Sequence, residues 1–142
     1  MATYFVRKRG KTKVVMLPMT TSVAISDGSL VAWSSGRLIA ATSTTASSDI
    51  AGVIRKTLTS ASAEYSTDSD VPVEMPVEKN VEWKFLGASL STSTVGTYLD
   101  ISNAYTVNGA ASTYDIVLHT KYVSATEGIG ILNIGADARA KA

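Results

Sequence analysis

The sequence predicts an all-β protein, and three observations support this. Apolar and polar residues alternate in several short runs; in VEWKF, for example, Val81, Trp83 and Phe85 hold every second position. Stretches rich in serine and threonine, such as TSTTASSD and SLSTST, separate these runs. No segment has the spacing of a long amphipathic helix. Alternation at period two is typical of strands with one face in a core, and small polar residues suit the turns between them.

The length of 142 residues fits one domain, because a chain of this size removes roughly two-thirds of its unfolded surface from water. We expect three parts: a basic N-terminal arm (residues 1–13), a β domain (residues 14–134) and a C-terminal tail (residues 135–142). With no cysteine in the chain, disulfides and thiolate metal sites are excluded, which fits folding in a reducing cytoplasm.

The N-terminal arm is strongly basic. It carries five cations and no acid, namely Arg7, Lys8, Arg9, Lys11 and Lys13, while the rest of the chain has eight basic and 12 acidic residues. Such an arm suggests three kinds of partner, namely nucleic acid, an anionic membrane surface and an acidic protein. Sequence-independent binding to nucleic acid usually needs a basic face over the whole domain. Nucleic acid is therefore the less favoured partner.

A hairpin is the first clear element of the β domain. In DGSLVAWSSGRLIAA, the runs Leu30–Trp33 and Arg37–Ala41 flank SSG. Gly36 supplies the positive φ angle that a tight turn needs.

The stretch DVPVEMPVE predicts an edge strand. Val71, Val73 and Met75 share one face, whereas Pro72 and Pro76 remove N–H donors from one edge. Prolines at alternate positions protect an edge strand from casual pairing.

Two further strands are predicted near the C-terminus. In DIVLHTKYVS, we expect Ile116, Leu118 and Tyr122 to share a buried face. The run GIGILNI predicts a closing strand whose glycines mark bends, before the tail.

No catalytic, cofactor-binding or metal-binding constellation is recognisable. His119 is the sole histidine, so a histidine cluster is impossible, and no G-x-S-x-G motif accompanies it. We interpret it as an ordinary strand histidine, and Asp68 and Asp70 as part of a solvated acidic loop. Basic residues interrupt any leader peptide, and no apolar run approaches the roughly 20 residues of a membrane span. These features predict a soluble protein that is not an enzyme and has no membrane partner.

The order of these signals resembles that of the capsid decoration, or cementing, proteins of tailed bacteriophages. The resemblance spans about Val14 to Ile134 and rests on AISDGSLVAWSSGRLIAAT, IAGVIRKT, VPVEMPVEKNVEWKF, VGTYLDI and DIVLHTKYVSATEGIGILNI. It implies a compact β barrel or β-tulip-like sandwich. It also implies a homotrimer, made in the host cytoplasm, that binds the major capsid protein at three-fold and quasi-three-fold positions on the outer surface of the virion. There it would stabilise the shell against packaged DNA, without a cofactor.

The alternative function is an OB-like protein that binds single-stranded nucleic acid. It is motivated by the basic arm together with Tyr4, Phe5, Trp33, Trp83 and Phe85, which could stack on bases. Alternation instead places Trp83 and Phe85 in a core, which we favour.

An acidic segment is a candidate partner for the arm. It contains Glu64, Asp68, Asp70, Glu74, Glu78 and Glu82, with only Lys79 to offset them. We hypothesise that the arm contacts either this segment on an adjacent subunit or the outer face of the capsid.

Overall fold

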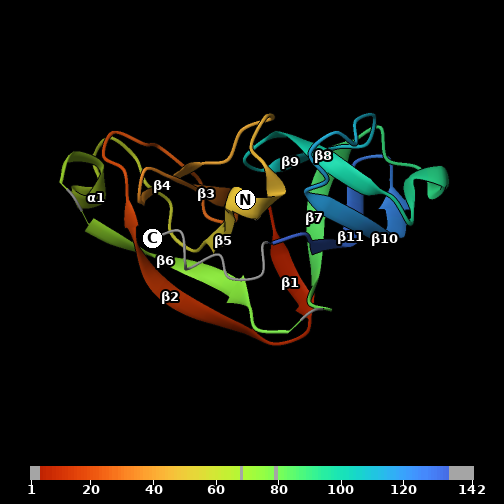
Figure 1. The fold of residues 1–142 in the computed structure, drawn as a ribbon, viewed down its shortest axis with the longest axis horizontal. Coiled ribbons are helices and arrows are strands. Elements are labelled where there is room, and N and C mark those ends of the chain that lie inside the picture. Colours follow the sequence, from red (N-terminus) through yellow and green to blue (C-terminus); the bar gives the residue numbers. More distant parts are fainter. Residues whose placement is uncertain (1–3, 68, 79, 135–142) are drawn as a thin grey trace.

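The computed structural model describes residues 4–67, 69–78 and 80–134, which form two groups of strands side by side (Figure 1). The first group, which we call the first ring, is a closed barrel with the strand order β2-β4-β3-β5-β6. Its strands are β2 (Thr12–Met19), β3 (Leu30–Ser34), β4 (Arg37–Ala40), β5 (Ile50–Ile54) and β6 (Ser69–Pro76).

The second group is a six-stranded sheet with the order β1-β7-β11-β10-β8-β9. Its strands are β1 (Val6–Arg9), β7 (Glu82–Ala88), β8 (Tyr98–Asn103), β9 (Thr106–Asn108), β10 (Val117–Ser124) and β11 (Glu127–Leu132). Because β9 also pairs with the end of β7 at Gly87 and Ala88, strands β7 to β11 close into a second ring with β1 attached outside.

Helical structure is limited to short connections. They are α1 (Ala63–Ser66) and the 3₁₀ turns η1 (Ser47–Asp49) and η2 (Thr92–Thr94). The all-β prediction is therefore confirmed. Among the described residues, no helix has the length and hydropathy that crossing a membrane requires.

A shared core joins the two rings into one body. Strand β5 is buried along its whole length because its side chains fill two clusters. Ala51 and Ile54 lie inside the first ring, whereas Ile50 and Val53 pack against Trp83 and the rest of the second ring's core. Burial of both faces explains why this strand reads as a continuous apolar run.

The predicted hairpin is confirmed. Strands β3 and β4 pair antiparallel with Ser34 opposite Arg37, which leaves a two-residue turn. Both turn residues have positive φ, 52° at Ser35 and 82° at Gly36. This is the type I′ geometry whose twist matches that of the flanking strands.

The basic segment has an extended backbone, as predicted, but it does not project from the body. Strand β1 pairs with β7, placing Val6 opposite Lys84, and residues 12–13 already belong to β2. Phe5, just before β1, is fully buried in the core shared by the rings. An apolar anchor thus precedes the cations, and a domain boundary after residue 13 would cut through β2.

The prediction that DVPVEMPVE forms an edge strand is wrong. It forms β6, which pairs with β2 along its whole length and with β5 on its other side. The predicted alternation of side chains holds, because Val71, Val73 and Met75 are buried in the first ring.

The two prolines fit into β6 because neither stands at a position that must donate an N–H to β2. The Val77 N–H donates to the Lys11 carbonyl oxygen at 3.0 Å, so odd-numbered residues of this segment direct their backbone groups toward β2. Pro72 and Pro76 therefore lack donors on the opposite side, where β5 pairs with β6 over only two residues.

The predicted buried face of β10 is also wrong. Val117 and His119 point into the core, while Leu118 is half-buried and Tyr122 is exposed. Ile116 is buried as predicted but precedes the strand, and the pairing with β11 shifts register after His119. Because Ile116 and Val117 are both buried, the inward face has already passed from even to odd positions before this register shift, and the alternation pattern gives no sign of this change.

The closing strand is confirmed as β11, but its glycines do not mark bends. A Cβ atom built on Gly128 would lie 2.8 Å from Phe85 Cζ and 2.9 Å from His119 Nε2. The glycine therefore makes room for two buried rings. The predicted tail, residues 135–142, lies outside the described residues.

Candidate interaction surface

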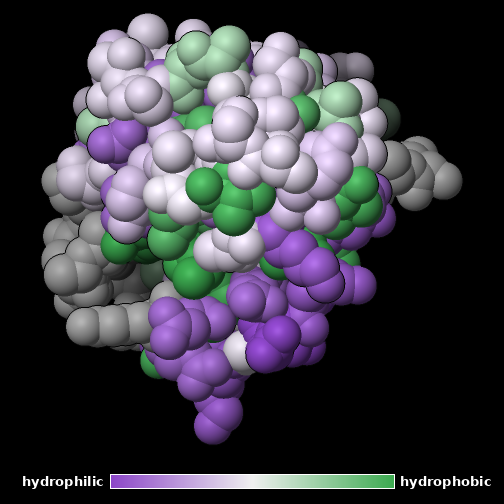
Figure 2. Space-filling model, turned by 90° about the vertical axis from the view of Figure 1, so that its right-hand side faces the viewer, coloured by the Kyte–Doolittle hydropathy of each residue, from purple (hydrophilic) through white to green (hydrophobic). Residues whose placement is uncertain are grey.

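The five predicted cations lie along β1, the β1–β2 turn and the start of β2, distributed over both faces of these strands. All five are exposed, and the side chain of Arg9 has a relative exposure of 80%. Figure 2 shows hydrophilic residues gathered at the lower end of the molecule, where Figure 1 places β1 and its turn.

Part of the predicted acidic segment meets these cations within the same chain. Arg7 Nε lies 3.6 Å from Glu74 Oε2, and Arg9 Nε lies 3.4 Å from Glu82 Oε1. The backbone N–H of Lys11 donates to Glu78 Oε1 at 2.9 Å. An adjacent subunit is therefore not needed to bring the basic and acidic segments together.

The other predicted acidic residues do not join this surface. Glu64 pairs with Lys56, and this hydrogen bond lowers the pKa of the Glu64 carboxyl. Asp70 is exposed at the start of β6, and Asp68 lies outside the described residues.

Glu74 is the centre of a partly buried polar cluster that the sequence did not reveal. Its Oε1 accepts from Arg55 Nε at 2.6 Å, and its Oε2 accepts from the Thr12 hydroxyl at 2.6 Å. Arg55 also donates to the Phe5 carbonyl oxygen at 2.8 Å and lies 6.0 Å from the centroid of the Trp83 ring. The cluster thus ties the first ring to β1 and to the second ring.

Exposed apolar side chains lie next to the cations on β2. Val14 and Met16 have relative exposures of 59% and 55%, the highest among the large apolar side chains of the described residues. We call the group of Arg7, Lys8, Arg9, Lys11, Lys13, Val14 and Met16 the β1–β2 surface. It combines charge and apolar area.

His119 lies elsewhere, fully buried inside the second ring. Its Nδ1 lies 2.9 Å from the Thr94 hydroxyl, its Nε2 lies 3.0 Å from the Lys121 carbonyl oxygen, and its ring meets Phe85 edge-on. Burial lowers the pKa of the imidazole, so the neutral form is favoured. With both nitrogens engaged inside a core, the residue has the structural surroundings of an ordinary strand histidine.

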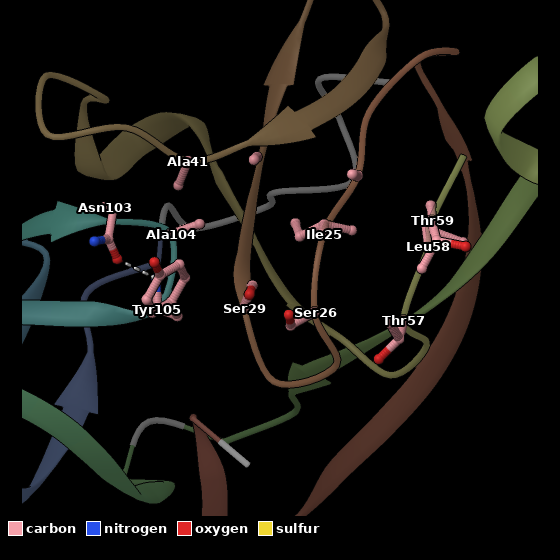
Figure 3. A pocket seen from close by; sticks show the side chains of 12 residues that line it. Ile25, Ser26, Ser29, Ala41, Thr57, Leu58, Thr59, Asn103, Ala104 and Tyr105 are labelled. Carbon is pink, nitrogen blue, oxygen red and sulfur yellow. Dashed lines mark hydrogen bonds between the residues drawn. The ribbon is translucent and has the colours of Figure 1, made fainter. Parts of the chain in front are cut away.

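A shallow cavity of about 460 Å³ lies between the rings (Figure 3). Tyr105 lies on one side of it and Thr57 and Leu58 on the other. Its lining contains no acid, no histidine and no basic residue, although the buried Ser29 hydroxyl lacks a hydrogen-bond partner. Among the described residues, no group of acids and histidine is placed to hold a metal ion.

The aromatic residues that motivated a base-stacking surface are mostly inaccessible. Phe5, Trp33, Trp83 and Phe85 are all at most 6% exposed, and Tyr4 is half-buried against Tyr105. A base could not lie on the buried rings without opening the core.

Comparison with known proteins adds no relative, since no family model, no curated protein and no solved structure matches the chain.

Proposed function

We propose that the protein is a structural decoration protein of a tailed-bacteriophage capsid. In this proposal it binds the major capsid protein on the outer surface of the virion, as a trimer at three-fold and quasi-three-fold positions. Its role is to stabilise the shell against packaged DNA, and it performs no chemistry. The order of sequence motifs from Val14 to Ile134 motivates the proposal.

The β1–β2 surface is the observation that carries it. Cations and exposed apolar side chains are carried there on paired strands, so the backbone loses little conformational entropy when a protein partner binds. Each exposed ion pair contributes only about 0 to 1 kcal/mol, so the surface acts through its number of charges. Three copies in a trimer multiply such weak contacts through effective concentration.

Binding to nucleic acid is the weaker candidate. Two of the cations, Arg7 and Arg9, already face carboxylates of the same chain. The rings of Trp83 and Phe85 are buried in the core. The features that motivated stacking on single strands are thus largely engaged within the protein.

The test uses shells of the encoding phage assembled without this protein. The chain should bind them saturably, in multiples of three copies, and salt should release it progressively. Sedimentation should show trimers in solution or, failing that, a particle map should show them on the shell. Binding to a single-stranded oligonucleotide at moderate salt, with no binding to shells, would overturn the proposal.

Charge substitution is a sharper test than deletion of residues 1–13. Deletion would remove the buried Phe5, β1 and the start of β2, and would therefore destabilise the body. A triple variant with Lys8, Lys11 and Lys13 changed to Ala should fold normally and occupy shells poorly. The control changes Lys56, Lys84 and Lys121 to Ala, which removes the same number of charges outside the β1–β2 surface. It also breaks the ion pairs of Lys56 with Glu64 and of Lys84 with Glu127, so both variants are compared after their folded fractions are matched. Equal occupancy by both variants would contradict the role of this surface.

A further inference from the structure

Strand β2 has an open edge although the first ring is closed. It pairs with β6 over eight residues, from Thr12 to Met19, but with β4 only at Met19. Figure 1 shows β2 along the lower boundary of the first ring, with β6 inside it. Among the described residues, positions 12–17 therefore have no strand partner on the side away from β6.

The hydrogen bonds of the flanking residues show which backbone groups face this edge. The Thr20 N–H donates to the Leu38 carbonyl oxygen of β4 at 3.0 Å, on the side away from β6. Because backbone groups alternate between the two edges of a strand, the even-numbered residues point the same way. The N–H and C=O groups of Thr12, Val14 and Met16 are thus directed outward.

The side chains along this edge are unusual for an unpaired strand. Edge strands are normally protected by charges, proline or bulges, because their free backbone groups can pair with another chain. Pro18, at an even position, directs no N–H toward this edge. The positions before it, Val14 and Met16, nevertheless carry the most exposed large apolar side chains of the described residues. Lys11 and Lys13 lie at the odd positions and so project to the opposite face of the strand.

Charge indicates what kind of segment would pair here. Around this edge the β1–β2 surface has five cations, whereas the carboxylates that meet it are those of Glu74, Glu78 and Glu82. The excess is positive and favours an acidic partner. A second β2 strand would instead bring like charges together at this edge.

We propose that the open edge of β2 binds an extended acidic segment of the partner protein by strand addition. Main-chain hydrogen bonds form with Thr12, Val14 and Met16, as in other complexes in which a peptide adds to a sheet. The segment alternates apolar residues, which pack on Val14 and Met16, with acidic residues, which face Lys11 and Lys13. The identification of that partner as the capsid protein rests on the proposed function, whereas the binding mode does not.

The test is nuclear magnetic resonance of the ¹⁵N-labelled full chain, which detects weak binding residue by residue. The probe is a capped seven-residue peptide in which valine and glutamate alternate. The amide signals of Val14 and Met16 should shift most. N-methylation of alternate peptide amides, or lysine in place of glutamate, should weaken binding at least tenfold. Equal binding of the N-methylated peptide, or shifts confined to other regions, would overturn the proposal.

Two variants separate backbone from side-chain effects. Val14→Pro removes the outward N–H and should reduce peptide binding at least tenfold, whereas Val14→Ala keeps that N–H and should reduce it less. If Val14→Pro does not fold, the N-methylated peptide still decides the question. Concentration-dependent broadening of the Val14 and Met16 signals without peptide would show that a second copy occupies the edge, and would overturn the proposal.

The same variants distinguish this inference from the proposed function. Shells that bind Val14→Pro as tightly as the unmodified chain would show that the edge does not hold the capsid protein, and would leave capsid decoration standing. Peptide binding at the edge together with no binding to shells would refute capsid decoration and leave the edge assignment standing.

Discussion

The two rings achieve closure in different ways. The interior of the first ring holds a cluster of apolar side chains, among them Leu17, Trp33 and Val73. The indole N–H of Trp33 is buried there without a hydrogen-bond partner among the described residues. The second ring also buries polar groups, since His119 is hydrogen-bonded inside it and Asp100 accepts three backbone N–H bonds from residues 113–115. The first ring leaves one edge of β2 open, whereas the second has β1 added outside it.

The two rings therefore differ in how strongly their interiors specify a single arrangement of the chain. Apolar packing closes the first ring with few directional constraints, which allows an unpaired edge to remain. In the second ring, the Asp115 N–H donates to Asp100, which fixes the loop before β10, and a hydrogen bond between His119 and Thr94 fixes η2. Satisfied buried polar networks specify one arrangement, because each unpaired group would cost free energy. We therefore expect the largest losses in the free energy of unfolding from substitutions in the second ring, in the shared core and in the Glu74 cluster. Changes at the open edge of β2 should have smaller effects.

The largest effect should come from Trp83→Ala. Trp83 is 1% exposed and packs in the core that both rings share. Removing its side chain should lower the free energy of unfolding by about 3 to 5 kcal/mol, and so prevent folding at ordinary temperatures. Chemical denaturation measures this, with Tyr122→Ala, an exposed aromatic of the same ring, as the control. Similar losses for both variants would show that the shared core does not join the rings.

The second largest effect should come from Arg55→Ala, which disrupts the Glu74 cluster that ties the two rings together. This change leaves Glu74, whose side chain is 12% exposed, without its closest cation. Removing one partner of a fully buried pair costs about 3 to 5 kcal/mol, and partial exposure reduces the expected loss to about 2 to 3 kcal/mol. Arg9→Ala, which breaks an exposed pair, should cost about 0 to 1 kcal/mol. Equal losses in denaturation would mean that the Glu74 cluster adds nothing specific.

Sequence reasoning succeeded wherever local pattern determines structure. The β3–β4 turn followed from Gly36, and the buried face of β7 followed from Trp83 and Phe85 at alternate positions. It failed for β10, because Ile116 and Val117 are both buried and the inward face changes from even to odd positions between them. It also failed for β6, because pairing partners come from distant parts of the chain. Alternation fixes which side chains share a face and says little about which strand lies alongside.

The candidate site was only half visible in the sequence. The cations from Arg7 to Lys13 stand out as a cluster, and three of the six predicted acidic residues, Glu74, Glu78 and Glu82, meet them. Arg55 was missed because it is an isolated arginine whose partners Glu74 and Phe5 are far away in sequence. The open edge of β2 could not be anticipated either, since it results from β4 pairing at a single position.

A smaller effect is expected from Gly128→Ala in the second ring. The added methyl group would overlap Phe85 Cζ, which lies 2.8 Å from the built Cβ position. Overpacking of this size should cost about 1 to 3 kcal/mol in denaturation. Phe85→Leu should relieve the overlap, so a double-mutant cycle should give a favourable coupling energy above about 0.5 kcal/mol. Strict additivity would show that the glycine is not there to make room.

The smallest effect should come from pH acting on His119. Burial lowers the pKa of this imidazole in the folded protein, whereas in the unfolded chain it is about 6.5. Protonation therefore favours unfolding, so the stabilisation is present above about pH 6.5 and declines as pH falls below that value. His119→Gln removes this dependence and retains an N–H donor for the Lys121 carbonyl oxygen. We expect the variant to fold and, under the proposed function, to occupy shells almost normally, because both nitrogens of the imidazole are engaged inside the core.

Urea unfolding at several pH values between 5 and 8 measures the difference between the two proteins, and carboxylates, common to both, cancel in the comparison. The free energies of unfolding should converge as the pH falls. Parallel curves would show that His119 is protonated equally in the folded and unfolded states, which its burial beside Phe85 argues against. Loss of shell binding with an intact fold would instead reveal a functional role for the second ring's interior, which the polar contacts of His119 with Thr94 and Lys121 do not require.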